Sequence, residues 1–139
     1  MPSPSTLTGS CLCGAVRIAL PDELEYAGYC HCRGCRRRSG SAFTAFGGIE
    51  VDKVRITQGE DRTAVARESD DGYSVFCGKC LSPLYAVVRD KQYAHVQLGC
   101  LDEPPSLAPD HHIWVSSNVP WHQIGDDLPQ FAEFHTGDG

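Results

Sequence analysis

The eight cysteines are the residues of this chain that are most able to do chemistry. Seven lie in short clusters and one stands alone: Cys11 with Cys13, Cys30 with Cys32 and Cys35, Cys77 with Cys80, and the solitary Cys100. Disulfide frameworks spread their cysteines so that bridges close long loops, whereas a tetrahedral metal needs several thiolates from each short segment. The first residues also lack the basic and apolar parts of an export signal. We therefore predict metal binding in a cytoplasmic protein, and zinc as the metal, because no ferredoxin spacing of cysteines is present.

The first and last clusters together can supply four thiolates to one zinc ion. Residues i and i+2 of a strand share a face, so Cys11 and Cys13 are expected to point to one side. Cys77 and Cys80 enclose Gly78 in a turn of the zinc-knuckle type. A closed four-thiolate site is structural, and its binding free energy is folding free energy. An alternative pairs the first two cysteines with part of the middle cluster.

The middle cluster, Cys30, Cys32 and Cys35, offers three thiolates. Three protein ligands with a vacant fourth position are typical of a catalytic zinc. The alternative is a second structural site, which Cys100 or a histidine would complete. His31 lies between two of the cysteines, and we expect it to support or pack behind the cluster.

Basic residues surround this cluster in a chain that is acidic as a whole. Arg33, Arg36, Arg37 and Arg38 fall within six positions, although the net charge is −6. Cations beside thiolates keep them deprotonated, and guanidinium groups bind carboxylates through two parallel hydrogen bonds. We predict that Arg33, Arg36 and Arg37 contact an acidic ligand. The overall negative charge argues against nucleic acid as a partner.

Short alternating segments dominate the rest of the chain, and no window shows sustained helical periodicity. The predicted strands cover residues 15–20, 26–30, 43–46, 54–57, 63–67, 73–76, 84–88, 93–98 and 111–116. Turns are expected at residues 47–48, 58–59, 70–72 and 89–90, and one short helical turn within 33–41. Residues 1–8 and about 135–139 are expected to be loose. A length of 139 residues fits one all-β domain of about eight to ten strands, and no segment is apolar enough to span a membrane.

Three smaller expectations concern single side chains. Cys100 is expected to be a small buried hydrophobic residue. Trp114 and Trp121 are expected in the core or in the wall of a pocket. Histidines elsewhere in the chain, His95 and His111 among them, are expected to be surface or hydrogen-bonded residues rather than acids.

The motifs in this order resemble the glutathione-dependent formaldehyde-activating family, whose domain is also called CENP-V/GFA. The first block is GSCLCGAV at 9–16, and the central one is CHCRGCRRRSGSAF at 30–43. Later blocks are FCGKC at 76–80, LY at 84–85, PDHHIWV at 109–115 and PW at 120–121. The resemblance spans about residues 9–131 and implies one domain over 1–139.

The resemblance implies a β-rich zinc fold of the Mss4-like type, a β-tent of two packed antiparallel sheets with little helix. It also implies two zinc ions, one structural at Cys11, Cys13, Cys77 and Cys80, and one catalytic at Cys30, Cys32 and Cys35. The family reaction adds the glutathione thiol to formaldehyde and forms S-(hydroxymethyl)glutathione, formally a carbon–sulfur lyase reaction run backwards. The expected function is thus a zinc-dependent, carbon–sulfur lyase-type enzyme with a small thiol such as glutathione as its partner.

Two readings compete with this expected function. The first is a non-enzymatic zinc module with two structural sites and an arginine loop for an acidic ligand. The second is an enzyme like the methionine sulfoxide reductases, which needs a catalytic cysteine that only Cys100 could supply. The oligomeric state stays open, a homodimer included.

Overall fold

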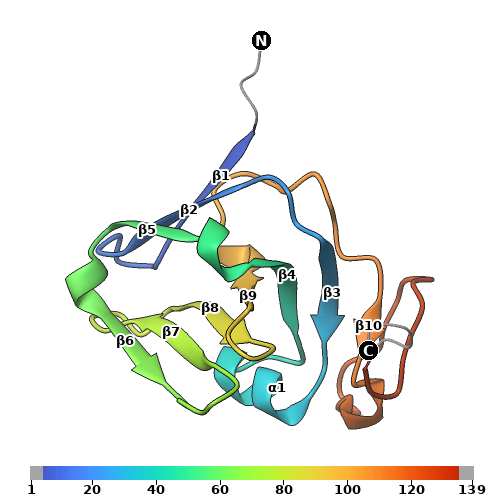
Figure 1. Cartoon of the computed structure of the whole chain (residues 1–139). Coiled ribbons are helices and arrows are strands. Elements are labelled where there is room, and N and C mark those ends of the chain that lie inside the picture. Colours follow the sequence, from blue (N-terminus) through green and yellow to red (C-terminus); the bar gives the residue numbers. More distant parts are fainter. Residues whose placement is uncertain (1–4, 135–139) are drawn as a thin grey trace.

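The computed structural model describes residues 5–134 (Figure 1). In this range the chain forms ten strands, one α-helix and four short 3-10 helices. The strands are β1 (Thr6–Ser10), β2 (Arg17–Pro21), β3 (Tyr26–Cys30), β4 (Thr44–Glu50), β5 (Arg55–Gln58), β6 (Thr63–Ala66), β7 (Tyr73–Cys77), β8 (Pro83–Val88), β9 (Tyr93–Gln97) and β10 (His112–Ile113). The helices are α1 (Arg33–Ser39), η1 (Val51–Lys53), η2 (Glu60–Arg62), η3 (Leu98–Cys100) and η4 (Val115–Ser117). The predicted all-β fold with little helix is confirmed.

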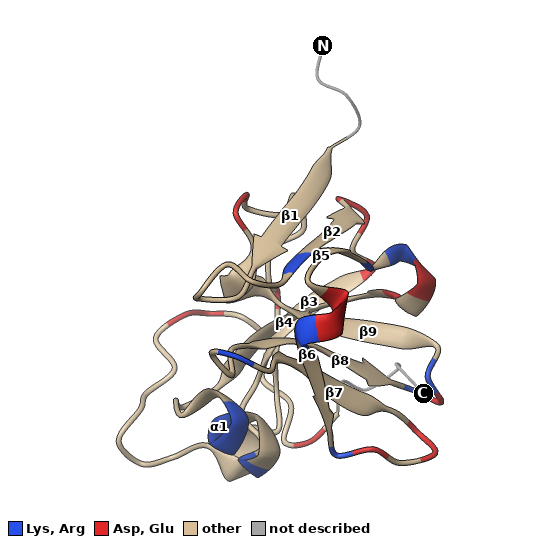
Figure 2. Ribbon diagram, turned by 90° about the vertical axis from the view of Figure 1, so that its left-hand side faces the viewer, with Lys and Arg blue, Asp and Glu red and all other residues tan. Residues whose placement is uncertain are grey.

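The strands form two sheets of unequal size. The smaller sheet has the order β1-β2-β5, and the larger has the order β10-β3-β4-β9-β8-β7-β6. The pairs are antiparallel except β10 with β3, which is parallel over two residue pairs. The small sheet lies across one end of the large sheet, and α1 lies at the other end (Figures 1 and 2). Figure 2 shows that basic residues gather on α1, away from the small sheet.

The main apolar core lies between the two sheets. Leu7 on β1 with Ile18 and Leu20 on β2 packs against Ile49 of β4 and Val96 of β9, and each is at most 1% exposed. Ile18 and Leu20 share a face because side chains alternate along a strand. Burying one such side chain contributes about 1.5–3 kcal/mol. This core holds the small sheet on the large one.

Two further apolar clusters each include cysteines. One contains Cys11 and Cys77 with Val16, Val75 and Leu84. The other contains Cys30 and Cys35, packed with Phe46 and Ile113. Each group of thiols is therefore embedded in its own patch of core, at a different place in the fold.

The expectation that residues 1–8 are loose is wrong for residues 6–8, which belong to β1. This strand pairs with β2 from Thr6 opposite Pro21 to Ser10 opposite Arg17. Its sequence, TLTGS, carries only one large apolar side chain, so alternation did not reveal it. Residues 1–4 and 135–139, also expected to be loose, lie outside the described range.

The predicted turn at Gly47-Gly48 is wrong, because both glycines lie inside β4. A Cβ atom at Gly48 would lie 2.2 Å from the ring of Tyr26, and one at Gly47 would lie 2.6 Å from Leu24. The glycines are needed for close packing of neighbouring side chains on the strand rather than for a turn.

Two other elements differ from their predicted extent. Helix α1 has seven residues, about two turns rather than one, and Gly40 ends it in the left-handed region at φ 68°. The strand predicted over 111–116 shortens to the two residues of β10, because Trp114 turns the chain at φ 59° into η4. None of the helices in the described range is long and apolar enough to cross a membrane.

Candidate metal centre and active site

The four cysteines Cys11, Cys13, Cys77 and Cys80 lie together, as the sequence predicted. Their sulfur atoms all fall within 4.8 Å of one another. The Cys13 Sγ lies 3.7 Å from that of Cys11 and 3.8 Å from that of Cys77. The route to this arrangement differs from the prediction, since Cys11 and Cys13 lie in the turn after β1 and not on a strand.

Backbone and hydroxyl donors surround these four sulfurs. The N–H of Val16 donates to Cys11 at 3.3 Å, and the N–H groups of Lys79 and Cys80 donate to Cys77 at 3.3 Å. The Ser82 hydroxyl, 3.1 Å from the Cys80 Sγ, lowers the pKa of that thiol to about 5. Such donors stabilise thiolates, the form in which cysteine binds metals.

The three cysteines Cys30, Cys32 and Cys35 form a second cluster within the same 4.8 Å limit. Cys30 ends β3, Cys32 caps α1, and Cys35 lies in the first turns of that helix. The Cys32 Sγ accepts the N–H of Cys35 at 3.3 Å, so one thiol both starts the helix and faces the cluster. The Arg38 Nη2 donates to the Cys35 Sγ at 3.5 Å.

The thiols of the three-cysteine cluster, Cys30, Cys32 and Cys35, differ in pKa. A hydrogen bond from the Cys30 thiol holds the pKa of Cys32 far below its usual range, and the same bond raises the pKa of Cys30. The hydrogen bonds within the cluster therefore favour the thiolate form of Cys32. Thiolates grouped in this way are the donor set that zinc prefers, so the residues present fit a metal at both clusters.

Within residues 5–134, no fourth cysteine, histidine or carboxylate joins the group formed by Cys30, Cys32 and Cys35. Cys100, one candidate for this position, packs instead against both of the other apolar clusters. Its Sγ approaches the carbonyl of Leu84 at 4.0 Å, and burial raises the pKa of its thiol to about 11.

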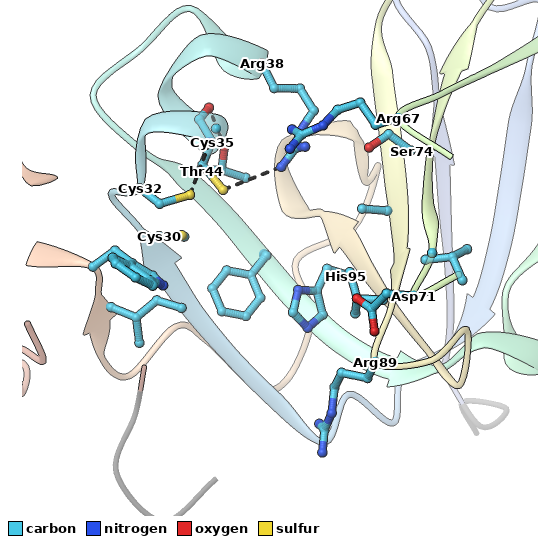
Figure 3. A pocket seen from close by; sticks show the side chains of 18 of the residues that line it. Cys30, Cys32, Cys35, Arg38, Thr44, Arg67, Asp71, Ser74, Arg89 and His95 are labelled. Atoms are coloured by element: carbon cyan, nitrogen blue, oxygen red, sulfur yellow. Dashed lines mark hydrogen bonds between the residues drawn. The ribbon is translucent and has the colours of Figure 1, made fainter. Parts of the chain in front are cut away.

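The trio lies at one end of a cavity of about 680 Å³, shown in Figure 3. Phe46, Val87, Ile113 and Trp114 are among its apolar walls. A volume of this size is typical of small-molecule sites, which hold roughly 300–1,000 Å³. The four-cysteine cluster contributes no residue to the cavity lining. One thiol cluster therefore faces this cavity, and the other lies away from it.

The arginines that line the cavity are not those predicted. Arg33 and Arg37 of α1 are exposed, and neither they nor Arg36 are among the lining residues. The lining instead includes Arg38, Arg67 and Arg89. Arg67 and Arg89 are far in sequence from Cys30, Cys32 and Cys35, so no pattern around this cluster pointed to them.

A hydrogen-bonded series of side chains lines the other part of the cavity. The Arg89 Nη1 donates to the Tyr26 hydroxyl at 3.2 Å, and that hydroxyl lies 2.8 Å from the His95 Nε2. His95 also stacks on Phe46, with ring centroids 4.7 Å apart. Burial, followed by the charges of Arg89 and Arg38, lowers the pKa of His95 to about 4. His95 is therefore neutral at pH 7 and acts as a hydrogen-bonding group.

His31 points away from the thiols, although it lies between Cys30 and Cys32. Its Nε2 lies 2.8 Å from the Nδ1 of His112, and His112 in turn bonds Asp126 at 3.0 Å. His31 is fully buried, and burial followed by the charge of His112 lowers its pKa. This position agrees with the expected packing role behind the cluster. Trp114 lines the cavity as expected, but Trp121 is 70% exposed, so its predicted place in the core or a pocket wall is wrong.

The low pKa of His95 predicts an acid-sensitive contribution to stability. The unfolded histidine binds a proton below pH 6.5, whereas the folded one does so only near pH 4, so stability falls as the pH drops through this window. Between pH 7.5 and 5, wild type should lose about 2 kcal/mol more than His95→Gln, at 1.36 kcal/mol per pKa unit. Urea unfolding of both proteins at both pH values measures this difference. Wild type and His95→Gln have the same cysteine clusters, so equal losses of stability in the two proteins would contradict the low pKa of His95.

Comparisons with known proteins agree with this fold and site. The family model described as glutathione-dependent formaldehyde-activating enzyme matches residues 6–117. A Halomonas elongata protein, assigned without proof as such an enzyme, is 25% identical over 126 residues, which are 85% of this chain and 80% of that protein. A Podospora anserina protein with the same unproven assignment is 26% identical over 129 residues, 91% of this chain, and the chain spans about half of its length (53%).

Among solved structures, a Rhodobacter sphaeroides protein superimposes with a TM-score of 0.58 at 24% identity. The match covers 68% of this chain and 87% of the other, and it shows that the two chains share a fold. The family match covers most of the chain, including both cysteine clusters. The chain therefore belongs to the glutathione-dependent formaldehyde-activating enzyme family.

Proposed function

We propose that the protein is a zinc-dependent, carbon–sulfur lyase-type enzyme that acts on a thiol–aldehyde adduct such as S-(hydroxymethyl)glutathione. Cys11, Cys13, Cys77 and Cys80 would hold a structural zinc, and Cys30, Cys32 and Cys35 a catalytic zinc. The observation that carries the proposal is the difference between the two clusters: the three-thiol cluster opens into the cavity of about 680 Å³, and the four-thiol cluster does not line it. An enzyme needs a ligand position at its metal, whereas a purely structural module does not.

The reaction is a reversible addition without redox change. A carbon–sulfur bond forms between the thiol and the aldehyde carbon, the carbonyl π bond opens, and the thiol proton ends on the new hydroxyl oxygen. A zinc ion bound by the three thiols would hold the incoming thiol and favour its deprotonation. The chain must bring the aldehyde carbon close to that sulfur, and such positioning supplies most of the acceleration for a reaction that already proceeds in water.

The residues around the trio have distinct parts in this scheme. Arg38, which donates to the Cys35 Sγ at 3.5 Å, offsets negative charge that would otherwise accumulate on three thiolates. The apolar walls near Phe46 and Trp114 limit the water around the reacting atoms. The neutral His95 and the Tyr26 hydroxyl are uncharged groups that can hydrogen-bond to a polar adduct.

The test follows the formaldehyde-dependent exchange of glutathione with its hydroxymethyl adduct by two-dimensional exchange NMR. We expect the exchange rate to rise with the concentration of zinc-loaded protein after the uncatalysed rate is subtracted. Bovine serum albumin at equal thiol concentration controls for free cysteine. A rate that is independent of the protein would contradict the enzymatic proposal.

Metal analysis distinguishes the enzyme from a module with two structural sites. We expect two zinc ions per chain, of which a chelator removes the one at the open cluster first. Two ions that are lost at the same rate would favour the non-enzymatic module. The measurement is zinc release followed with a chromogenic chelator, alongside circular dichroism to confirm that the chain stays folded after the first ion leaves.

A further inference from the structure

Two guanidinium groups from separate elements approach one another beside the three-thiol cluster (Figure 3). Arg38 comes from α1, and Arg67 follows the end of β6; Figure 3 shows their side chains pointing toward one another above Cys35. Arg38 Nη2 lies 3.5 Å from the Cys35 Sγ. A Cβ atom built on Gly34 would lie 3.4 Å from the Arg67 Nη1 and 3.9 Å from the Cys32 Sγ. The Arg67 Nη1 and the Cys32 Sγ are therefore no more than about 7.3 Å apart.

Neither guanidinium forms an ion pair with a carboxylate of the described residues. Among residues 5–134, the ion pairs involve Arg17, Lys53, His111 and His112, and none involves Arg38 or Arg67. The Arg38 Nε is buried without a hydrogen-bond partner in this range. The chain carries a net charge of −6, so carboxylates are plentiful elsewhere. Two cations that converge without an acid repel one another, and an anion between them would relieve that repulsion.

The backbone of Arg67 adopts an unfavourable conformation to reach this place. Its φ is 61°, in the left-handed region that residues other than glycine seldom occupy. Strain of this kind costs on the order of 1–3 kcal/mol and concentrates at binding and catalytic sites. Among residues 5–134, the one acid that lines the cavity is Asp71, which lies at the other end near His95 (Figure 3). Its Oδ1 accepts the N–H of Asp90 at 2.9 Å. No carboxylate of the described chain thus competes for the arginine pair.

We infer that Arg38 and Arg67 form a carboxylate subsite, so that the cavity selects thiols that carry an acid group a few bonds from the sulfur. This inference rests on the proposed function, because it takes the thiol to bind at the three-cysteine cluster. Guanidinium forks match carboxylates geometrically and bind them through charge-assisted hydrogen bonds. Neutral thiols of equal size fit the same space but bring no carboxylate to either guanidinium group.

The test uses two thiols of equal size, 3-mercaptopropionate and 3-mercaptopropionamide, titrated into the zinc-loaded protein by isothermal calorimetry. Wild type should bind the acid about tenfold more tightly than the amide. Arg67→Ala should bind both thiols equally, and Arg67→Lys should keep part of the preference because it retains the charge without the fork. Arg55→Ala is the matched control: it removes one exposed positive charge on β5 and should keep the full preference.

Each outcome separates the subsite from the proposed function. Equal binding of acid and amide by wild type, or a preference that survives Arg67→Ala, overturns the subsite while thiol binding itself stands. Binding of neither thiol overturns the proposed function, and the subsite with it. Arg67 is exposed, so its substitution should leave the urea midpoint near that of wild type, which is measured in parallel.

Discussion

Cys77→Ser is expected to leave the chain without a cooperative folded state. The Cys77 side chain is fully buried and lies where β7 meets the turn after β1. Structural zinc contributes about 10–16 kcal/mol in small zinc domains, which equals or exceeds the roughly 5–15 kcal/mol net stability of a typical domain. Loss of one of the four thiolates should therefore remove more free energy than the net stability of the folded chain. Circular dichroism during urea titration, with zinc content measured on the same sample, tests this expectation.

Cys100→Ser provides the control for that experiment. Cys100 is half-buried and contacts the same apolar clusters, but it belongs to neither metal-binding group. We expect this variant to unfold cooperatively, with two zinc ions and a loss of about 1 kcal/mol, a usual cost for a single substitution. A Cys77→Ser protein that unfolds at the urea midpoint of Cys100→Ser would show that the four-thiol cluster is dispensable for folding.

Cys32→Ser should have the opposite effect: the protein stays folded and loses its activity. Cys32 caps α1 by accepting the Cys35 N–H, and serine is a favourable residue at that position, so the helix should persist. We expect the free energy of unfolding to change by less than about 1.5 kcal/mol. One zinc ion per chain should be lost, and the glutathione exchange rate should fall at least about 100-fold, because the reacting thiol loses its anchor.

Cys32→Ala distinguishes loss of the thiol from loss of the helix cap. Serine removes only the thiol, whereas alanine removes both the thiol and the cap. Cys32→Ala should therefore match Cys32→Ser in activity and be about 1 kcal/mol less stable. The measurements are exchange NMR for the rate and urea unfolding for the stability. If Cys32→Ser instead unfolds as completely as Cys77→Ser, both clusters are structural and the enzymatic proposal fails.

Much of the fold was predictable from local patterns. The strand at Tyr26–Cys30, which leads into the three-cysteine cluster, was predicted with its observed bounds. Strand β1 was missed because its sequence is mostly polar and Leu7 is its one large apolar side chain in the core. The double glycine in β4 was misread as a turn, because the reason for it is the ring of Tyr26 on the neighbouring strand.

The candidate site, like the fold, was predictable from the sequence only in part. The sequence by itself determined one group of three thiols, Cys30, Cys32 and Cys35, and two pairs, Cys11 with Cys13 and Cys77 with Cys80, because spacings of two or three residues place these sulfurs close together. The tertiary structure decided that the two pairs meet in one four-thiol group. Only the tertiary structure decided which group opens to a cavity, and that Arg38 with Arg67 and Arg89, rather than Arg33, Arg36 and Arg37, line it. Arg67, Arg89 and His95 come from β6, β8, β9 and the turns after them, so their meeting depends on strand register across the large sheet. Register is set by long-range packing, which no short motif encodes.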